Sequence, residues 1–248
     1  MGKYFDFEYT GAAFQLFGPA HLWTAVGMAA LFVVYLRAGK AGDAARRTRM
    51  RVSIAVFLVS LDLGAHLFFS LNGVWTPQAL LPLHMCSAVT YIMAYAFLTD
   101  SRRLYPLVYF LGIAGAIQAV ITPDAAQFGY PHFRFWDSLL SHGGLVLAGL
   151  WVVLVEGVKP TLRNLTETFA GLNVYALVLF FVNMALGSNY LYVNGKPDIA
   201  SAMDLMPAWP YYILVLEALV ILVFMLLYLP FRRSQTPVRP TPLDVSAR

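Results

Sequence analysis

Apolar residues recur along the chain in seven runs of about 20 residues, separated by short polar segments. An α-helix of this length crosses the roughly 30 Å hydrocarbon core of a bilayer, so each run predicts a membrane-spanning helix. The runs lie at 19–38, 52–71, 80–99, 104–122, 137–157, 169–188 and 209–230. The pattern therefore predicts an all-α integral membrane protein with seven transmembrane helices, forming one domain at 19–230.

The segments that flank this domain have a different character. Residues 1–18 are rich in Phe and Tyr, which favour the interface between membrane and water. Residues 231–248 contain Pro237, Pro240 and Pro242 and have no apolar periodicity, so we expect a disordered cytoplasmic tail. A basic loop follows the first run, which argues against a cleaved secretory signal.

The distribution of positive charge predicts how the spans are oriented. Of the 17 Lys and Arg residues, 14 follow the first, third, fifth and seventh spans, and only Lys3, Arg134 and Lys196 lie on the other side. Because basic loops stay in the cytoplasm, we expect the N-terminus outside and the C-terminus in the cytoplasm. This orientation requires an odd number of spans, in agreement with seven, and predicts a multi-pass protein of the cell membrane.

The composition excludes several other classes of protein. Apolar residues make up 59% and charged residues 12% of the chain, against roughly 45–50% and 25% in soluble domains. The net charge of +4 does not indicate nucleic-acid binding, because basic loops are attracted to anionic lipid. The single cysteine, Cys86, can form neither an internal disulfide nor a multi-cysteine metal site.

Polar residues within the predicted spans gather in the outer half of the membrane, where they are candidates for function. These residues are Asp62, His66, His84, Cys86, Gln118, His142, Asn183, Asn189 and Glu217. Asp62 lies too deep to reach water, and His66, one helical turn away, is its expected partner. In contrast, we expect His21, His132 and Asp137 to lie at wet helix ends.

Potential chemistry is densest in the segment Leu81-Pro82-Leu83-His84-Met85-Cys86-Ser87. Pro82 suits the first turn of a helix, which would place Cys86 near a helix N-terminus, where the positive end of the dipole favours a thiolate. The dipole alone does not ionise a thiol, so a base is required. His84 lies about 200° around the helix from Cys86, and we therefore expect His142, at the same depth in the fifth span, to be the base. The alternative is an inert, buried thiol.

Several separated motifs carry a family resemblance. They are the segment Leu81–Ser87, the stretch from Tyr130 to His142, Leu186-Gly-Ser-Asn-Tyr-Leu191, Lys196-Pro197 and Trp209-Pro-Tyr-Tyr212. From about residue 15 to 230, the chain resembles the YwaF-like family of bacterial integral membrane proteins. It is more distantly similar to eukaryotic transmembrane protein 164, a cysteine-dependent acyltransferase acting on phospholipids.

The resemblance implies roles for two residues. The nucleophile of the eukaryotic protein begins a Cys-x-x-Val-Thr pattern, which is matched by Cys86-Ser-Ala-Val89-Thr90. A histidine in the following outward loop and span is matched by His142. The chain departs from the eukaryotic pattern at His84, which stands two residues before the cysteine rather than directly after it.

Together these features predict a membrane-embedded lipid acyltransferase or lipid hydrolase with an outward-facing polar cavity. Cys86 would be the nucleophile and His142 the base, while His84, Ser87 or Asn189 would stabilise the oxyanion. Supporting roles or a proton path fall to Asp62 and His66. The expected substrate is a membrane phospholipid or lysophospholipid, and the reaction requires no cofactor.

Two alternatives remain open at this stage. A zinc-dependent lipid hydrolase could use His66, His84 and His142 with Asp62, although no His-x-x-x-His pair occurs. A transporter or receptor could instead bind a small polar ligand through the polar residues of several spans. These residues are Asp62, Asn183, Asn189 and Glu217. A retinal protein is excluded because the seventh span contains no Lys for a Schiff base.

Overall fold

The computed structural model describes residues 2–123, 125, 127–197 and 202–235, and these residues form helices and loops without a strand. Seven α-helices follow one another along the chain. They are α1 (Pro19–Ala41), α2 (Ala44–Leu71), α3 (Met85–Thr99), α4 (Tyr105–Ile121), α5 (Phe133–Leu154), α6 (Leu162–Leu186) and α7 (Tyr211–Tyr228). Short 3-10 helices are η1 (Lys3–Phe5), η2 (Tyr190–Tyr192), η3 (Ala202–Leu205) and η4 (Leu229–Gln235).

The helices agree with the predicted apolar runs in number and order. Five of them are long and apolar enough to cross a membrane, namely α1, α2, α5, α6 and the last, counted as Tyr211–Arg233. The other two, α3 and α4, are apolar but shorter, with 15 and 17 residues. We expected residues 231–248 to be disordered, but η4 continues through Gln235. Residues 236–248 lie outside the described part of the chain.

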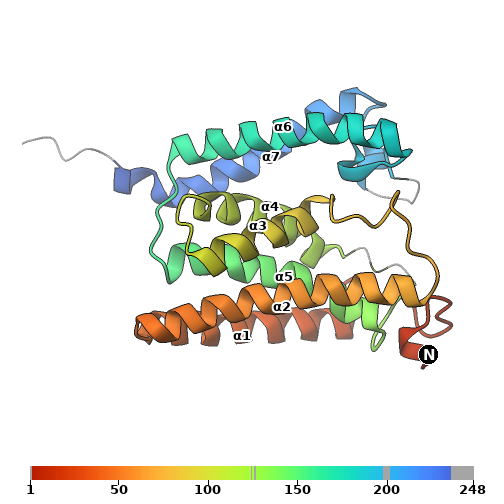
Figure 1. Ribbon diagram of the computed structural model, residues 1–248, viewed down its shortest axis with the longest axis horizontal. Coiled ribbons are helices and arrows are strands. Elements are labelled where there is room, and N and C mark those ends of the chain that lie inside the picture. Colours follow the sequence, from red (N-terminus) through yellow and green to blue (C-terminus); the bar gives the residue numbers. More distant parts are fainter. Residues whose placement is uncertain (1, 124, 126, 198–201, 236–248) are drawn as a thin grey trace, which may run out of the picture.

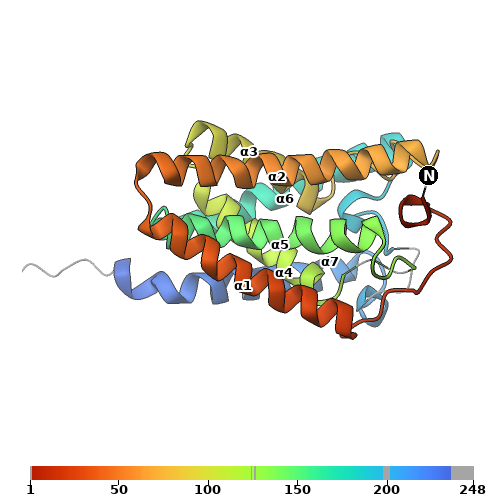
Figure 2. The ribbon, with the colours of Figure 1, turned by 90° about the horizontal axis from the view of Figure 1, so that it is seen from below.

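The helices lie side by side in an elongated bundle (Figure 1), with α5 at its centre. α5 packs against α1, α2 and α4, and α3 packs against α2 and α4. In the apolar window of α5, 61% of the residues are buried, compared with 11% in α6 and in α7. α6 and α7 therefore lie at the periphery, and Figure 2, seen from the opposite side of the bundle, shows α5 between α1 and α2.

Glycines allow the central helix to approach its neighbours closely. A Cβ atom at Gly144 would lie 2.6 Å from Cδ2 of Leu58 on α2. A Cβ atom at Gly149 would lie 2.6 Å from Cγ1 of Ile113 on α4. Real Cβ atoms do not approach other atoms so closely, so these two positions of α5 depend on the missing side chain.

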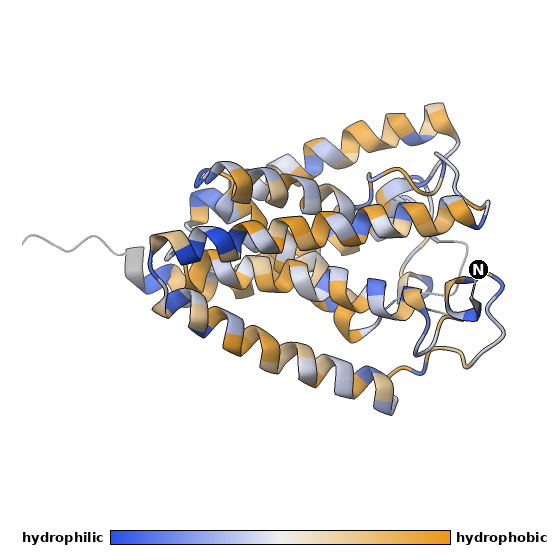
Figure 3. Cartoon of the chain, turned by 60° about the horizontal axis from the view of Figure 1, so that its bottom comes forward, coloured by the Kyte–Doolittle hydropathy of each residue, from blue (hydrophilic) through white to orange (hydrophobic). Residues whose placement is uncertain are grey.

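Buried charges join the helices at the end of the bundle opposite the N-terminus, where Figure 3 shows the strongest hydrophilic colour. Arg51 donates to the carbonyl oxygen of Phe97 at 2.9 Å and to Asp100 at 2.6 Å. It also lies 3.4 Å from Glu156, which pairs with Arg102 at 3.0 Å. Arg51 therefore has a structural role beyond the attraction of basic loops to lipid, because its buried guanidinium pairs with acids from two other segments.

The N-terminal segment covers the other end of the bundle. The backbone of Phe7 donates to the side chain of Asn72 at 2.9 Å, and Gly129 donates to Ala12 at 3.0 Å. The ring of Phe5 stacks on that of Phe133 with 5.7 Å between centroids. These contacts hold the N-terminal segment against the end of α2, the loop before α5 and the start of α5.

Candidate functional site

Asp62 and His66 belong to a hydrogen-bonded chain that joins α2, α3 and the loop after α2. The indole N–H of Trp75 donates to Nδ1 of His66 at 3.0 Å, and Tyr91 donates to Oδ2 of Asp62 at 2.7 Å. Nε2 of His66 lies 3.5 Å from the same Asp62 oxygen, so the expected neighbours do meet. Because an indole can only donate, the neutral ring of His66 carries its proton on Nε2, facing Asp62.

A second acidic residue, Asp137 on α5, lies near Asp62 and is buried. Nη1 of Arg134 donates to its carboxylate, and the Arg134 guanidinium lies 4.9 Å from the centre of the Phe69 ring. The expectation that Asp137 lies at a wet helix end is thus wrong, because Arg134 and the packing of α2 against α5 cover its side chain.

His21 and His132 were also expected at a wet interface and are likewise buried. His21 donates through Nε2 to the carbonyl oxygen of Val120 at 2.9 Å. The N-terminal segment covers His132, whose Nε2 lies 3.1 Å from the carbonyl oxygen of Asp6. Burial lowers the pKa of His132, which lies before α5, and this favours the neutral ring. His21 thus joins the start of α1 to the end of α4, and His132 holds the N-terminal segment at the start of α5.

The helix that carries Cys86 starts later than predicted. α3 begins at Met85 after the N-cap residue His84, so Cys86 is its second residue and Pro82 precedes the helix. The reason is tertiary, since the N–H of Leu81 donates to the Tyr190 hydroxyl at 2.8 Å and the Leu83 carbonyl accepts from Tyr175 at 2.8 Å. The bond from Tyr175 occupies the Leu83 carbonyl, which in a helix starting at residue 80 would accept from the N–H of Ser87, and the bond to Tyr190 fixes the backbone at Leu81.

Cys86 faces the interior of the bundle. It is half-buried and packs against the main apolar core. The residues three, seven and eleven positions later, Val89, Met93 and Phe97, are buried and share its face of α3. The hydroxyl of Thr90 donates to the Cys86 carbonyl at 3.0 Å, so the Cys-x-x-Val-Thr pattern describes the first turns of this helix.

Contacts along α4 relate the level of Cys86 to that of His142. Gly112 of α4 lies against α5, since a Cβ atom added there would be 3.2 Å from the Leu145 carbonyl oxygen. Gly115 of α4 lies against α3, since a Cβ atom added there would be 3.7 Å from Cγ of Met85. α4 and α5 are consecutive helices that pack against each other and run in opposite directions. Because Gly112 lies at the level of Leu145, Gly115 lies at the level of His142, three residues before Leu145. Cys86 and His142 therefore lie at a similar depth.

His142 has the tautomer that a base requires. Its Nδ1 lies 2.7 Å from the Ser138 carbonyl oxygen. Because a carbonyl only accepts, Nδ1 carries the proton and the lone pair of the neutral ring is on Nε2. The pairing of this nitrogen with the Cys86 thiol stays a prediction.

Two of the expected oxyanion donors already have structural roles. The amide of Asn189 donates to the Gly195 carbonyl at 2.9 Å and accepts from the Asn194 backbone at 3.3 Å, which closes a turn. The ring of His84 lies between those of Tyr190 and Tyr192, with centroid distances of 5.1 and 5.4 Å. Ser87, the third residue of α3, is half-buried.

Neither alternative set of residues converges. In the described part of the chain, no three His, Cys, Asp or Glu side chains are grouped closely enough to hold a metal ion, so the proposed zinc ligands His66, His84, His142 and Asp62 do not form such a group in this structure. The transporter set is also dispersed. Asn183 bonds to the Tyr190 backbone, Glu217 accepts from Asn173 at 3.1 Å between α6 and α7, and Asp62 bonds to Tyr91.

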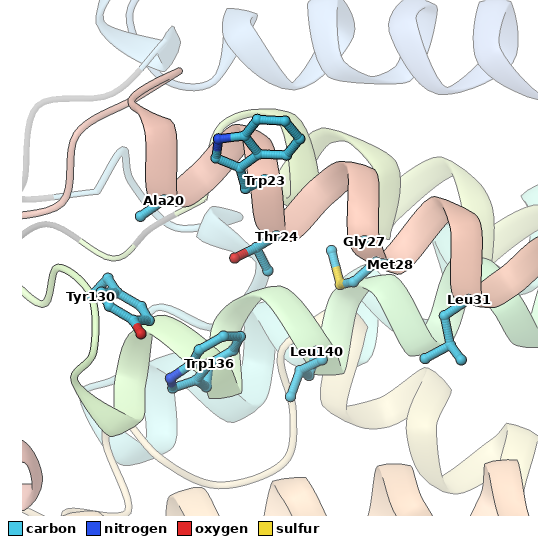
Figure 4. Close-up of a pocket in the computed structure, with 9 residues that line it drawn as sticks. All are labelled: Ala20, Trp23, Thr24, Gly27, Met28, Leu31, Tyr130, Trp136 and Leu140. Atoms are coloured by element: carbon cyan, nitrogen blue, oxygen red, sulfur yellow. The ribbon is translucent and has the colours of Figure 1, made fainter.

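Two grooves open on the sides of the bundle. One of ≈ 520 Å³ lies between α1 and α5 (Figure 4) and is lined mainly by apolar and aromatic side chains, among them Trp23, Met28, Leu31, Trp136 and Leu140. The other, of ≈ 340 Å³, lies beside the N-terminal segment. Neither is lined by Cys86, His84 or His142, so neither is the polar cavity expected from the sequence.

The sequence analysis missed four aromatic residues around the site. Trp75, Tyr91, Tyr175 and Tyr190 hydrogen bond to the segments that carry Asp62, His66 and Cys86, and none of them was a candidate from the sequence. The one available signal was Tyr190, which lies in the Leu186–Leu191 motif. The partners of the other three are separated from them by 9, 29 and 92 residues, and spacing alone does not predict such pairs.

A helical bundle with spans of membrane length and a polar site at one end defines a multi-pass membrane protein. The model of the TMEM164 family matches residues 16–228, and the chain belongs to this family. An uncharacterized protein of Treponema pallidum (strain Nichols) is 28% identical over 225 residues, covering 90% of this chain and 92% of the relative. No solved structure matches the chain. The family match confirms the resemblance to transmembrane protein 164 and gives no support to the YwaF-like label.

Proposed function

We propose that this chain is a membrane-embedded lipid acyltransferase or lipid hydrolase, with Cys86 as nucleophile and His142 as base. The observation that carries the proposal is the position of Cys86, the only cysteine, as the second residue of α3. The amides and dipole of a helix N-terminus favour negative charge on a side chain there. Membership of the TMEM164 family, together with the Cys86-x-x-Val89-Thr90 pattern, adds to this support.

The proposed reaction has two steps. Nε2 of His142 takes the thiol proton, and the sulfur of Cys86 attacks the carbonyl carbon of a phospholipid ester. The ester C–O bond breaks, the leaving alkoxide takes the proton from His142, and an acyl thioester remains. The hydroxyl of a lysolipid, or water, then loses its proton to His142 and attacks the thioester. The C–S bond breaks, the acyl product leaves, and the sulfur of Cys86 takes the proton back from His142, which restores the thiol and the neutral ring.

The surrounding residues have supporting roles in this proposal. Ser87 is favoured as the oxyanion donor, because the amide of Asn189 is bonded to Gly195 and the ring of His84 packs against those of two tyrosines. Asp62 and His66 hold α2 against α3 through Tyr91. We propose seven spans with the N-terminus outside, which would place Cys86 at the depth of lipid ester groups in the outer leaflet.

The test uses the full chain in phospholipid nanodiscs with a fluorescent acyl donor and a lysophospholipid acceptor. Cys86→Ala should abolish both acyl transfer and the hydroxylamine-sensitive acyl label on the protein. His142→Ala should reduce turnover at least ~100-fold, the usual contribution of a general base. The matched control is Thr166→Ala, which removes an exposed hydroxyl bonded only to the carbonyl of its own helix. Full activity of the Cys86→Ala protein would overturn the proposal.

A further inference from the structure

We infer that Tyr190 is a positioning residue for Cys86, acting through the loop that leads into α3. The inference deepens the proposed function and rests on it for its catalytic consequence. Its structural basis is independent of that function, because it concerns what determines the place of the only cysteine in the chain.

The Tyr190 hydroxyl links two points of this loop. It donates to the Pro77 carbonyl at 2.6 Å and accepts from the Leu81 N–H at 2.8 Å. Burial raises the pKa of Tyr190, which lies in the loop after α6, so the hydroxyl keeps the proton that it donates to Pro77. The side chain is fully buried, which makes both bonds costly to lose.

Tyr190 is itself held rigidly from α6. The side-chain oxygen of Asn183 accepts from the Tyr190 N–H at 2.8 Å, and its side-chain nitrogen donates to the Tyr190 carbonyl at 3.0 Å. The same oxygen accepts from Ser188 at 2.9 Å. Asn183 is buried in α6, so the position of Tyr190 is fixed relative to a long helix rather than to a loop.

The remaining contacts carry this constraint to Cys86. The ring of Tyr190 meets that of His84, the N-cap of α3, edge-on at 5.1 Å. The hydroxyl of Tyr175, a residue of α6, donates to the Leu83 carbonyl at 2.8 Å. Tyr175, which is part of α6, and Tyr190, which is bonded to α6 through Asn183, therefore determine where α3 begins. Cys86 is the second residue of α3. No side chain caps this helix start within the described residues, so the tyrosines supply the constraint that a cap would otherwise give.

The chain offers a direct measurement, because a maleimide can react only at Cys86. Tyr190→Phe keeps the ring against His84 but removes both bonds of the hydroxyl, and Tyr175→Phe removes the bond to Leu83. Each change should release the start of α3 and raise the alkylation rate of the half-buried thiol by at least about 3- to 10-fold, the equivalent of one lost hydrogen bond, and Tyr190→Phe, which loses two, should have the larger effect. In the acyl-transfer assay, kcat should fall while KM stays within about twofold.

The matched control is Tyr109→Phe, which removes a tyrosine hydroxyl bonded to the Leu227 carbonyl at 2.9 Å, at the other end of the bundle. A merely structural effect would change thermal stability in all three variants and leave alkylation unchanged. Alkylation of Tyr190→Phe at the wild-type rate would overturn the inference. If that variant does not fold, Tyr175→Phe decides in the same way. If the wild-type protein has no acyl-transfer activity but the two variants are alkylated faster than it, the positioning role is supported and the proposed function is refuted.

Discussion

At the scale of single residues, buried charge determines how the end opposite the N-terminus is held together. The Arg51 side chain is 7% exposed and the Glu156 side chain 6%, so their interaction is poorly screened. Arg51 also donates to Asp100, which follows α3. A guanidinium with five donors in a fixed plane suits such a junction of several acceptors.

This geometry predicts a large effect of Arg51→Ala on stability. Arg51→Ala removes the buried cation but leaves Glu156 paired with Arg102, so the cost should approach, without reaching, the about 3–5 kcal/mol of a buried charge left with no partner. We expect a clear drop in the midpoint of thermal unfolding in detergent. Arg163→Ala is the control, because Arg163 and Glu167 form an exposed pair on α6 with side chains 85% and 55% accessible, and it should change the midpoint little. Equal midpoints for the two variants would contradict this account.

Residue spacing predicts a contact only when both residues share one helix. The four-residue spacing of Asp62 and His66 was enough to predict their meeting. The spacing carries no information about Tyr91, which reaches Asp62 from α3, or about Trp75, which selects the tautomer of His66. The candidate site was therefore predictable within α2 and not across its contacts with other segments.

At the scale of elements, α5 organises the bundle because it can approach several helices closely. Gly143 lies against Met28 of α1, Gly144 against Leu58 of α2, and Gly149 against α4. Small residues at such contacts are characteristic of membrane bundles, where helices associate through close packing.

Gly144→Ala tests this packing. The added Cβ would lie 2.6 Å from Leu58, so α2 and α5 must separate, and overpacking of this kind costs about 1–3 kcal/mol. We expect a lower midpoint of thermal unfolding. Gly27→Ala in α1 is the matched control, because nothing lies within 4 Å of the added atom, and its midpoint should be unchanged or slightly higher. A Gly144→Ala protein as stable as the Gly27→Ala protein would show that the contact is unimportant.

The start of α3 shows how a helix boundary escapes prediction. Leu81–His84 continues the apolar run of the helix, and Pro82 is compatible with a first turn. The hydroxyl groups of Tyr175 and Tyr190 nevertheless bind the backbone of this segment and keep it outside the helix. The predicted run begins at residue 80, which would place Cys86 in its second turn. Because hydroxyl groups from α6 and from the loop after it bind the preceding segment, α3 begins at Met85 and Cys86 lies in its first turn.

At the scale of the whole molecule, the distribution of positive charge predicts the orientation in the membrane. The split of 14 to 3 among the Lys and Arg residues predicts a cytoplasmic C-terminus. In a bacterial host, green fluorescent protein fused after Arg248 should fluoresce, and alkaline phosphatase fused there should be inactive. The same two reporters fused before Met1, with an added signal where export requires one, should give the opposite results. A phosphatase active at the C-terminus would reverse the proposed orientation and move Cys86 to the inner leaflet.

The sequence by itself determined the helical class, the number and order of the apolar helices and their approximate limits. It could do so because hydrophobic length and period depend on neighbouring residues alone. Only the tertiary structure decided that His21, His132 and Asp137 are buried, that Arg51 joins three segments and that α3 begins at Met85. Each of these features depends on a hydrogen bond, an ion pair or a covering segment contributed from elsewhere in the chain, and such partners meet only when the helices pack.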